Sequence, residues 1–164
     1  EPDACTKDIA SICIRFNAKI IGADWGFGNG GMNSMIKKLL PSDFIFVTFR
    51  HSVIKKYIAY DEQGETYVTN RTEVMTDLFN KIKTHLLEFY RWEDFEFIGK
   101  DYLNINAEYS ETLRQIRYIH SQPDDAFHSL IYCVLCWMII NKKIPTTRYD
   151  PGEDDMDVHF FKND

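Results

Sequence analysis

The sequence lacks any apolar run long enough to span a membrane. Its most apolar stretch, residues 129–140, has the length of a buried helix, whereas a transmembrane helix needs about 20 apolar residues. The N-terminal residues do not join a basic segment to a long apolar one, so no secretory signal is expected. We therefore expect no membrane partner.

Three catalytic motifs are also missing. The only glycine-rich stretch, GFGNGG at residues 26–31, does not end in the Gly-Lys-Ser/Thr of a phosphate-binding P-loop. No Gly-x-Ser-x-Gly elbow occurs, and no two of the five histidines have the close helical spacing of a zinc motif. These absences argue against an ATPase, a serine hydrolase and a zinc protease.

Cysteine is scarce and positive charge is in deficit. Four cysteines are present, and Cys133 and Cys136 lie in an apolar run, where small buried side chains are a simpler interpretation than a zinc or redox site. We expect a reducing, intracellular compartment. The net charge of −6 argues against general nucleic-acid binding, but metal-binding acids would add negative charge that cations cancel. Scattered basic residues could still follow a DNA backbone: Lys55, Lys56, Arg71, Lys81, Lys83, Arg114, Arg117, Lys142 and Lys143.

What remains is a chain that predicts one α/β domain. The 164 residues, 45% hydrophobic, suffice for one core, which we place at about residues 18–142, with an acidic, mobile tail at 145–164. A sheet of mixed direction, flanked by helices, is expected. Strands are predicted at 19–24, 43–50, 55–60, 65–69, 95–98 and 115–121, a glycine loop at 26–31, and helices at 32–40, 71–90 and 124–142.

Asp24 is the first candidate site residue. It ends an apolar strand and is followed by the glycine loop, which places its carboxylate at the edge of a sheet where α/β proteins gather their sites. An Asp that only initiates a turn would look the same.

The second candidate cluster opens the apolar helix at residue 124. Asp124 and Asp125 can serve as a helix cap and a first-turn acid, or one of them can cap while the other binds a metal; we assign the cap to Asp124 and the ligand role to Asp125. His128 lies one turn further, where it can bind metal, position water or move a proton, or simply make a surface hydrogen bond.

A third acid is needed for a two-metal site. Glu73, at the start of the helix predicted at 71–90, is our choice, although a capping box with Asn70 explains it equally well. Asp77, one turn later, is the reserve. Two Mg²⁺ or Mn²⁺ ions held by such acids would activate water against a phosphodiester.

Three segments resemble the nuclease domain of the large terminase subunit of tailed bacteriophages, a branch of the ribonuclease H-like fold. They are GADWGFG at 22–28, NRTEVMTD at 70–77 and PDDAFHSLIY at 123–132. The first looks like the family's first strand with its catalytic Asp, and the last looks like its final helix with an acid and a nearby His. The second acid departs from the pattern, since Asn70 stands where many members carry Asp, and His128 follows Asp125 where many members place the His first.

The resemblance implies a two-metal endonuclease that cuts concatemeric double-stranded viral DNA during genome packaging. It implies metal ligands among Asp24, Glu73 and Asp125, an absent ATPase motor domain, and the small terminase subunit and portal as partners in the host cytoplasm. Two alternatives remain: another ribonuclease H-like nuclease, of the resolvase or transposase type, or a non-catalytic interaction domain in which these acids only cap helices and turns.

Overall fold

A four-stranded sheet forms the centre of the protein. The computed structural model describes residues 2–28, 31–111, 115–144 and 147–154. Strands β1 (Ile20–Asp24), β2 (Ile45–Ser52) and β4 (Thr66–Asn70) run parallel, and β3 (Ile58–Asp61) pairs antiparallel with β4, in the order β1-β2-β4-β3. The sheet is therefore mixed, as the sequence predicts.

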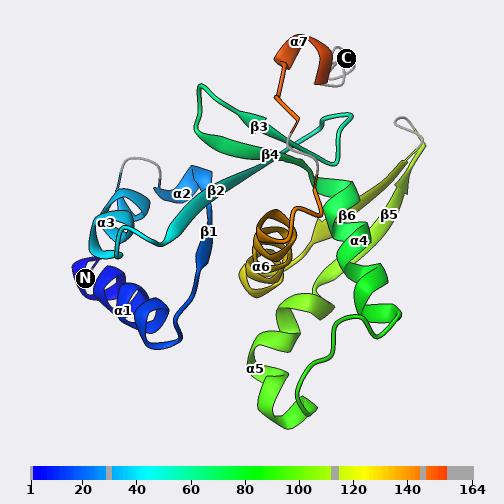
Figure 1. The fold of residues 1–164 in the computed structure, drawn as a ribbon. Helices are drawn as coiled ribbons and strands as arrows, with labels where there is room; N and C mark the ends of the chain where they lie inside the picture. The colour runs from blue at the N-terminus through cyan, green and yellow to red at the C-terminus, as the bar shows by residue number, and fades with distance from the viewer. Residues whose placement is uncertain (1, 29–30, 112–114, 145–146, 155–164) are drawn as a thin grey trace.

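Helices lie on both sides of this sheet (Figure 1). On one side are α1 (Pro2–Arg15), the one-turn α2 (Trp25–Gly28) and α3 (Met32–Leu39). On the other side, α4 (Arg71–Lys83) and α6 (Asp125–Ile140) enclose the main core with the sheet. No described helix combines the length and the apolar composition of a membrane span.

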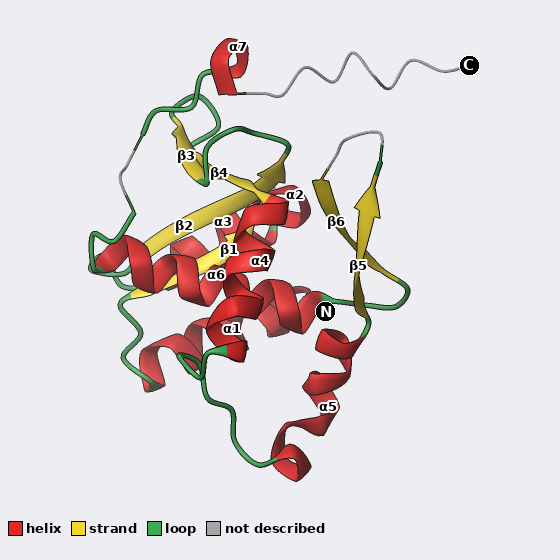
Figure 2. Cartoon of the chain, turned by 90° about the vertical axis from the view of Figure 1, so that its right-hand side faces the viewer, coloured by secondary structure: helices red, strands yellow, loops and turns green. Residues whose placement is uncertain are grey.

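A second, smaller sheet stands beside the first (Figure 2). Its strands, β5 (Ile105–Ser110) and β6 (Gln115–His120), form an antiparallel pair that follows α5 (Trp92–Leu103). A hydrogen bond of 3.0 Å between the hydroxyls of Thr76 and Tyr118 ties β6 to α4. This pair is separate from the central sheet and does not extend it.

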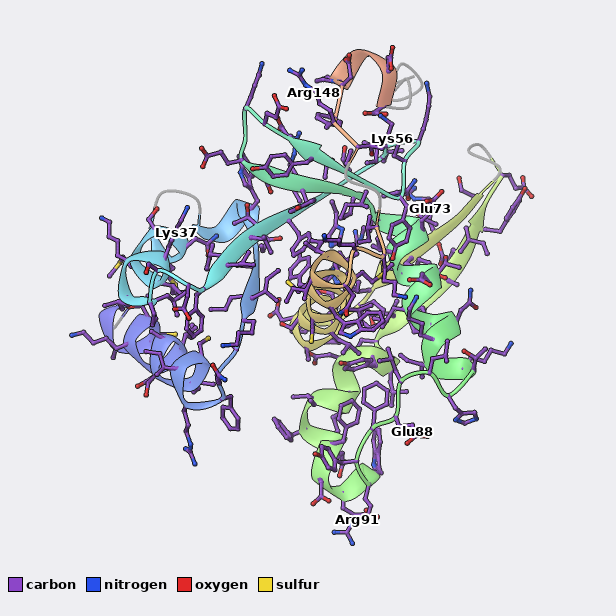
Figure 3. All side chains as sticks on the ribbon, viewed as in Figure 1. Lys37, Lys56, Glu73, Glu88, Arg91 and Arg148 are labelled. Atoms are coloured by element: carbon purple, nitrogen blue, oxygen red, sulfur yellow. The ribbon has the colours of Figure 1, made fainter. Side chains whose placement is uncertain are left out.

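Part of the acidic C-terminal segment packs on β3. The N–H of Tyr149 donates to the carbonyl of Tyr60 at 2.9 Å, and the N–H of Tyr60 donates to the carbonyl of Thr147 at 2.8 Å. The short helix α7 (Pro151–Asp154) then places Asp154 against Lys56, which Figure 3 labels, at 2.9 Å. Residues 147–154 therefore cover the edge of the sheet, while the rest of the predicted tail, 145–146 and 155–164, lies outside the described residues.

Three predicted elements differ from the structure. Residues 26–28, predicted as part of a glycine loop, belong to the one-turn helix α2. Local packing explains the other two. Residues 95–98 belong to helix α5, since a helical spacing brings the rings of Trp92, Phe95 and Tyr102 onto one side, where Phe95 contacts both. The helix predicted at 71–90 ends at Lys83, because His85 adopts a left-handed backbone with φ of 57°. Helix α1, where the sequence showed no clear period, was not predicted.

A close contact at Gly22 joins α6 to the edge strand β1. A Cβ atom at this position would lie 2.7 Å from Sγ of Cys136, 2.8 Å from the ring of Phe49 and 3.3 Å from Cβ of Tyr132. Only glycine leaves room for α6 at this distance. Because side chains alternate along a strand, Asp24 lies on the same face as Gly22 and so faces the same helix.

We expect Gly22→Ala to destabilise the fold by about 1–3 kcal/mol, the usual cost of adding a methyl group to a packed core. Urea denaturation followed by circular dichroism measures this. Gly152→Ala is the matched control, because a Cβ at the exposed Gly152 would approach Oδ1 of Asp150 at an ordinary 3.4 Å; its free energy of unfolding should not fall by more than about 0.5 kcal/mol. Equal stabilities for the two variants would contradict the packing argument.

Candidate active site

The parallel strands β1, β2 and β4 end at one edge of the sheet and bring polar side chains together there. Asp24 ends β1, and His51 lies at the end of β2, directly paired with Thr69 of β4. The side-chain amide of Asn33 on α3 donates to the carbonyl of Asp24 at 2.9 Å and holds the end of β1 in place. The site begins at this edge, where sites of α/β proteins are commonly found.

Helix α6 adds three side chains to the same edge. Asp124, His128 and Tyr132 are spaced four residues apart and therefore lie on one face of the helix. The Tyr132 hydroxyl donates to Oδ2 of Asp24 at 2.9 Å, and His128 Nε2 lies 3.1 Å from Oδ2 of Asp124. Helix α6 thus contacts the end of β1 through Tyr132, and its His128 contacts Asp124 at the start of the same helix.

His51 connects these two contacts. Its Nε2 lies 3.1 Å from Nδ1 of His128 and 3.4 Å from the hydroxyl of Tyr132. Asp24 and Asp124, far apart in the sequence, are therefore joined by a chain of contacts through Tyr132, His51 and His128. The sequence predicted that the carboxylates of Asp24 and Asp125 meet; the structure instead links Asp24 to Asp124 through three intervening side chains.

The positions of the protons in this series of hydrogen-bonded side chains follow from counting donors. The Thr69 hydroxyl is closer to His51 Nδ1, at 2.7 Å, than to the Arg50 carbonyl, at 3.3 Å, so we assign its proton to His51. A neutral His51 then donates from Nε2 to His128 Nδ1, and a neutral His128 donates from Nε2 to the Asp124 carboxylate. With both rings neutral, this assignment supplies one proton to each of the three contacts.

The electrostatics agree with neutral rings. Burial lowers the pKa of His51 to about 4, and repulsion from His128, whenever that ring is protonated, and from the Arg71 cation adds to this effect. Burial is also the largest cause that lowers the pKa of His128. Burial and the neighbouring Asp24 carboxylate raise the pKa of Tyr132, so its hydroxyl stays protonated and remains a donor.

Asp124 is not used as a helix cap. Its side chain makes no capping hydrogen bond, although it occupies the N-cap position of α6. Asp101 of α5 accepts the N–H of Ala126 at 3.0 Å instead and satisfies part of the helix start. Asp124 is buried and faces His128, whereas Asp125, to which we assigned the ligand role, is exposed.

The other predicted acids do not join this cluster through any contact that the structure records. Glu73 is exposed at the β4 end of α4 (Figure 3), and its N–H donates to the Asn70 side chain at 3.1 Å. The reciprocal half of a capping box is not formed, because the Asn70 N–H donates to the Tyr57 carbonyl. Asp77 accepts from the hydroxyl of Tyr57 at 2.9 Å and pairs with Lys81.

Sequence reasoning missed four residues of the cluster: His51, Thr69, Tyr132 and, except as one of many basic residues, Arg71. A signal existed for Tyr132, since the spacing Asp124–His128–Tyr132 already indicates one helix face. No comparable signal existed for His51, because only the register of β2 against β1 and β4 brings it to the site.

The donor set partly fits the divalent ions that the sequence predicted. No group of three or more His, Cys, Asp or Glu side chains within the described residues is arranged to hold a metal. Carboxylate oxygens such as those of Asp24 and Asp124 are nevertheless the ligands that Mg²⁺ and Mn²⁺ accept, and Mg²⁺ is commonly bound by one or two carboxylates completed by water and substrate phosphate. The chemistry fits such an open site and does not fit a preformed three-acid cage.

Comparison with known proteins does not identify a relative: no protein-family model, curated protein or solved structure matches the chain.

We expect the partly buried His51 to make stability fall in mild acid. Since its pKa is about 4 in the folded protein and 6.5 ordinarily, the unfolded chain binds more protons between these values. Unfolding is therefore favoured as pH falls from about 6.5 to about 4, by on the order of 3 kcal/mol from this group. Urea denaturation across pH 4–8 measures the slope.

His51→Gln is the informative comparison for this slope. The variant should show a flatter dependence of the unfolding free energy on pH below 6.5, whatever its absolute stability, with a residual slope from His128. An identical slope in the two proteins would show that His51 titrates normally.

Proposed function

We propose that the protein is a metal-dependent endonuclease that hydrolyses phosphodiester bonds in double-stranded DNA. The observation that carries the proposal is the connection of Asp24, at the end of a parallel strand, with Asp124, at the start of α6, through Tyr132, His51 and His128. Two carboxylates brought to one sheet edge from distant parts of a chain are typical of sites that bind divalent cations.

Asp24 and Asp124 would hold the metal. When bound, Mg²⁺ or Mn²⁺ would lower the pKa of a water molecule and stabilise negative charge on the phosphate oxygens. The chain's own residues orient the two carboxylates: Oδ1 of Asp24 accepts the N–H of Gly26 at 2.7 Å, and Oδ2 accepts the Tyr132 hydroxyl. His128 holds Asp124 in the same way. Because both rings are neutral and their protons are engaged, the histidines position Asp124 in this arrangement.

We further propose a ribonuclease H-like fold and the terminase nuclease family, with concatemeric viral DNA as substrate. Contact between two of the resembling segments supports this, because Gly22 from residues 22–28 packs against Tyr132 from residues 123–132. On this proposal a terminase ATPase domain, the small subunit and the portal would be partners in the host cytoplasm, and two ions would be used. Glu73 and Asp125 are the remaining acids from which a second ion could draw ligands.

One observation favours the non-catalytic alternative. The bond from Gly26 N–H to Asp24 is the bond expected of an Asp that only shapes a turn. The same alternative requires Asp124 to cap α6, and there Asp101 supplies the bond instead. The two candidate functions therefore assign different roles to Asp124, and its observed contacts support the catalytic function better.

We expect Asp24→Asn and Asp124→Asn each to lower the rate of plasmid cleavage in Mn²⁺ by at least about 100-fold, a typical effect of removing a group that acts in the transition state. Asp125→Asn is the matched control, since it changes the same charge on the neighbouring, exposed residue, and it should retain activity within a few-fold. If Asp125→Asn loses activity while Asp124→Asn retains it, the assignment of Asp124 is refuted and the exposed acid is the functional one.

We expect Mn²⁺ to bind saturably in isothermal titration calorimetry and the binding to be lost in Asp24→Asn, because hard cations need anionic oxygen ligands. EDTA should abolish cleavage, and added Mn²⁺ should restore it. Wild-type protein that cleaves DNA equally well in EDTA, or Asp24→Asn protein that binds Mn²⁺ normally, would refute the assignment of Asp24. Linear and branched duplexes assayed side by side separate a packaging nuclease from a resolvase.

A further inference from the structure

Arg71 is a cation placed among the acids and histidines of the candidate site. It is the first residue of α4 and follows β4 directly, so it lies at the edge where β1 ends in Asp24 and β2 presents His51. Its charge reaches the whole cluster, since it lowers the pKa of His51 and of His128. The proposed function above does not use it.

The guanidinium of Arg71 has unused hydrogen-bonding capacity. Its Nη2 lies 3.8 Å from Oδ2 of Asp124, too far for a hydrogen bond, and its Nε is buried without a partner in the described part of the chain. A guanidinium carries five N–H donors. The side chain is 39% exposed, so a ligand can reach it.

Arg50 shows what a structural arginine looks like in the same protein. Its Nε is also without a partner, but its Nη2 donates to Asp61 at 3.0 Å, and its guanidinium lies over the ring of Tyr149 at 5.1 Å. Arg50 is therefore engaged with a carboxylate and an aromatic ring. Among the described residues, the guanidinium of Arg71 has one long ion pair, with Asp124, and no recorded hydrogen bond to a carboxylate or contact with an aromatic ring.

We propose that Arg71 binds a phosphate group of the DNA backbone and holds it beside the carboxylates of Asp24 and Asp124. This inference rests on the proposed function, because it names how that site takes its substrate. The planar guanidinium can donate two parallel hydrogen bonds to one phosphate. A positive side chain is also needed there, because a phosphodiester that approaches two carboxylates would otherwise be repelled.

The test is the binding of a short fluorescent DNA duplex, measured by anisotropy in EDTA at several salt concentrations, so that no cleavage occurs. We expect Arg71→Ala to bind on the order of 10- to 100-fold more weakly, the scale of a lost charge-assisted hydrogen bond. The slope of log affinity against log salt should also fall by about one, which a purely structural role would not change. Circular dichroism checks that each variant is folded.

Two variants control for charge and for folding. Arg91→Ala removes the same side chain at the start of α5, where Arg91 is exposed and paired with Asp94, and should leave both affinity and slope unchanged. Arg71→Lys keeps the charge but loses the paired donors, so its affinity should lie between the wild type and Arg71→Ala. An unchanged affinity and slope in Arg71→Ala, or no duplex binding by the wild type at low salt, would overturn the proposal.

Two further arms separate the sources of phosphate and the two proposals. Inorganic phosphate is titrated while the Arg71 Nε–H resonance is followed by NMR; a shift with free phosphate but none with the duplex would overturn the assignment to DNA. Cleavage is then assayed in Mn²⁺. If duplex binding depends on Arg71 but no cleavage is seen, the role of Arg71 stands and the proposed nuclease function is refuted. If the wild type cleaves DNA and Arg71→Ala cleaves it with an unchanged KM, the nuclease function stands and the role of Arg71 is refuted.

Discussion

The absence of a side chain at Gly22 is the constraint on which the candidate site depends. It allows α6 to approach β1 so closely that Tyr132 and Cys136 lie against the strand. Once Tyr132 is placed, the helical repeat carries His128 and Asp124 to the end of the sheet on the same face. The parallel register then brings His51 between them. One packing contact in the core thus determines the geometry of polar groups at the edge.

Around this contact, residues outside the candidate site make the hydrogen bonds that stabilise the helix starts. Asp101 satisfies the start of α6, which leaves Asp124 available to face His128. The Asn70 side chain caps α4 by accepting the N–H of Glu73, and the side chain of the next residue, Arg71, takes no part in this cap. This division matters because a carboxylate that already bonds a helix end has less capacity to bind a ligand. Burial lowers the pKa of His51 and so keeps its ring neutral.

Local patterns were sufficient for the four strands of the central sheet, for β6 and for the two helices α3 and α6, whose bounds the structure largely confirms, but not for β5. They succeeded at Asp24 because an apolar strand followed by glycines indicates a sheet edge, and at residue 124 because an acid before a long apolar run indicates a helix start. They failed at Phe95, whose aromatic neighbours look like a strand until their helical contacts are known. They also failed at the end of α4, where His85 takes a backbone conformation that usually belongs to glycine.

By itself, the sequence determined the α/β class, the position of Asp24 at a strand end and the four-residue spacing of Asp124, His128 and Tyr132, because these depend on periodicity within one segment. Only the tertiary structure decided which acid of the pair at 124 and 125 turns inward, that Glu73 stays exposed, that His51 contacts His128, and that Arg71 lies near Asp124. Those outcomes depend on strand register and on a close contact between helix and strand, and neither is encoded in the residues next to the site.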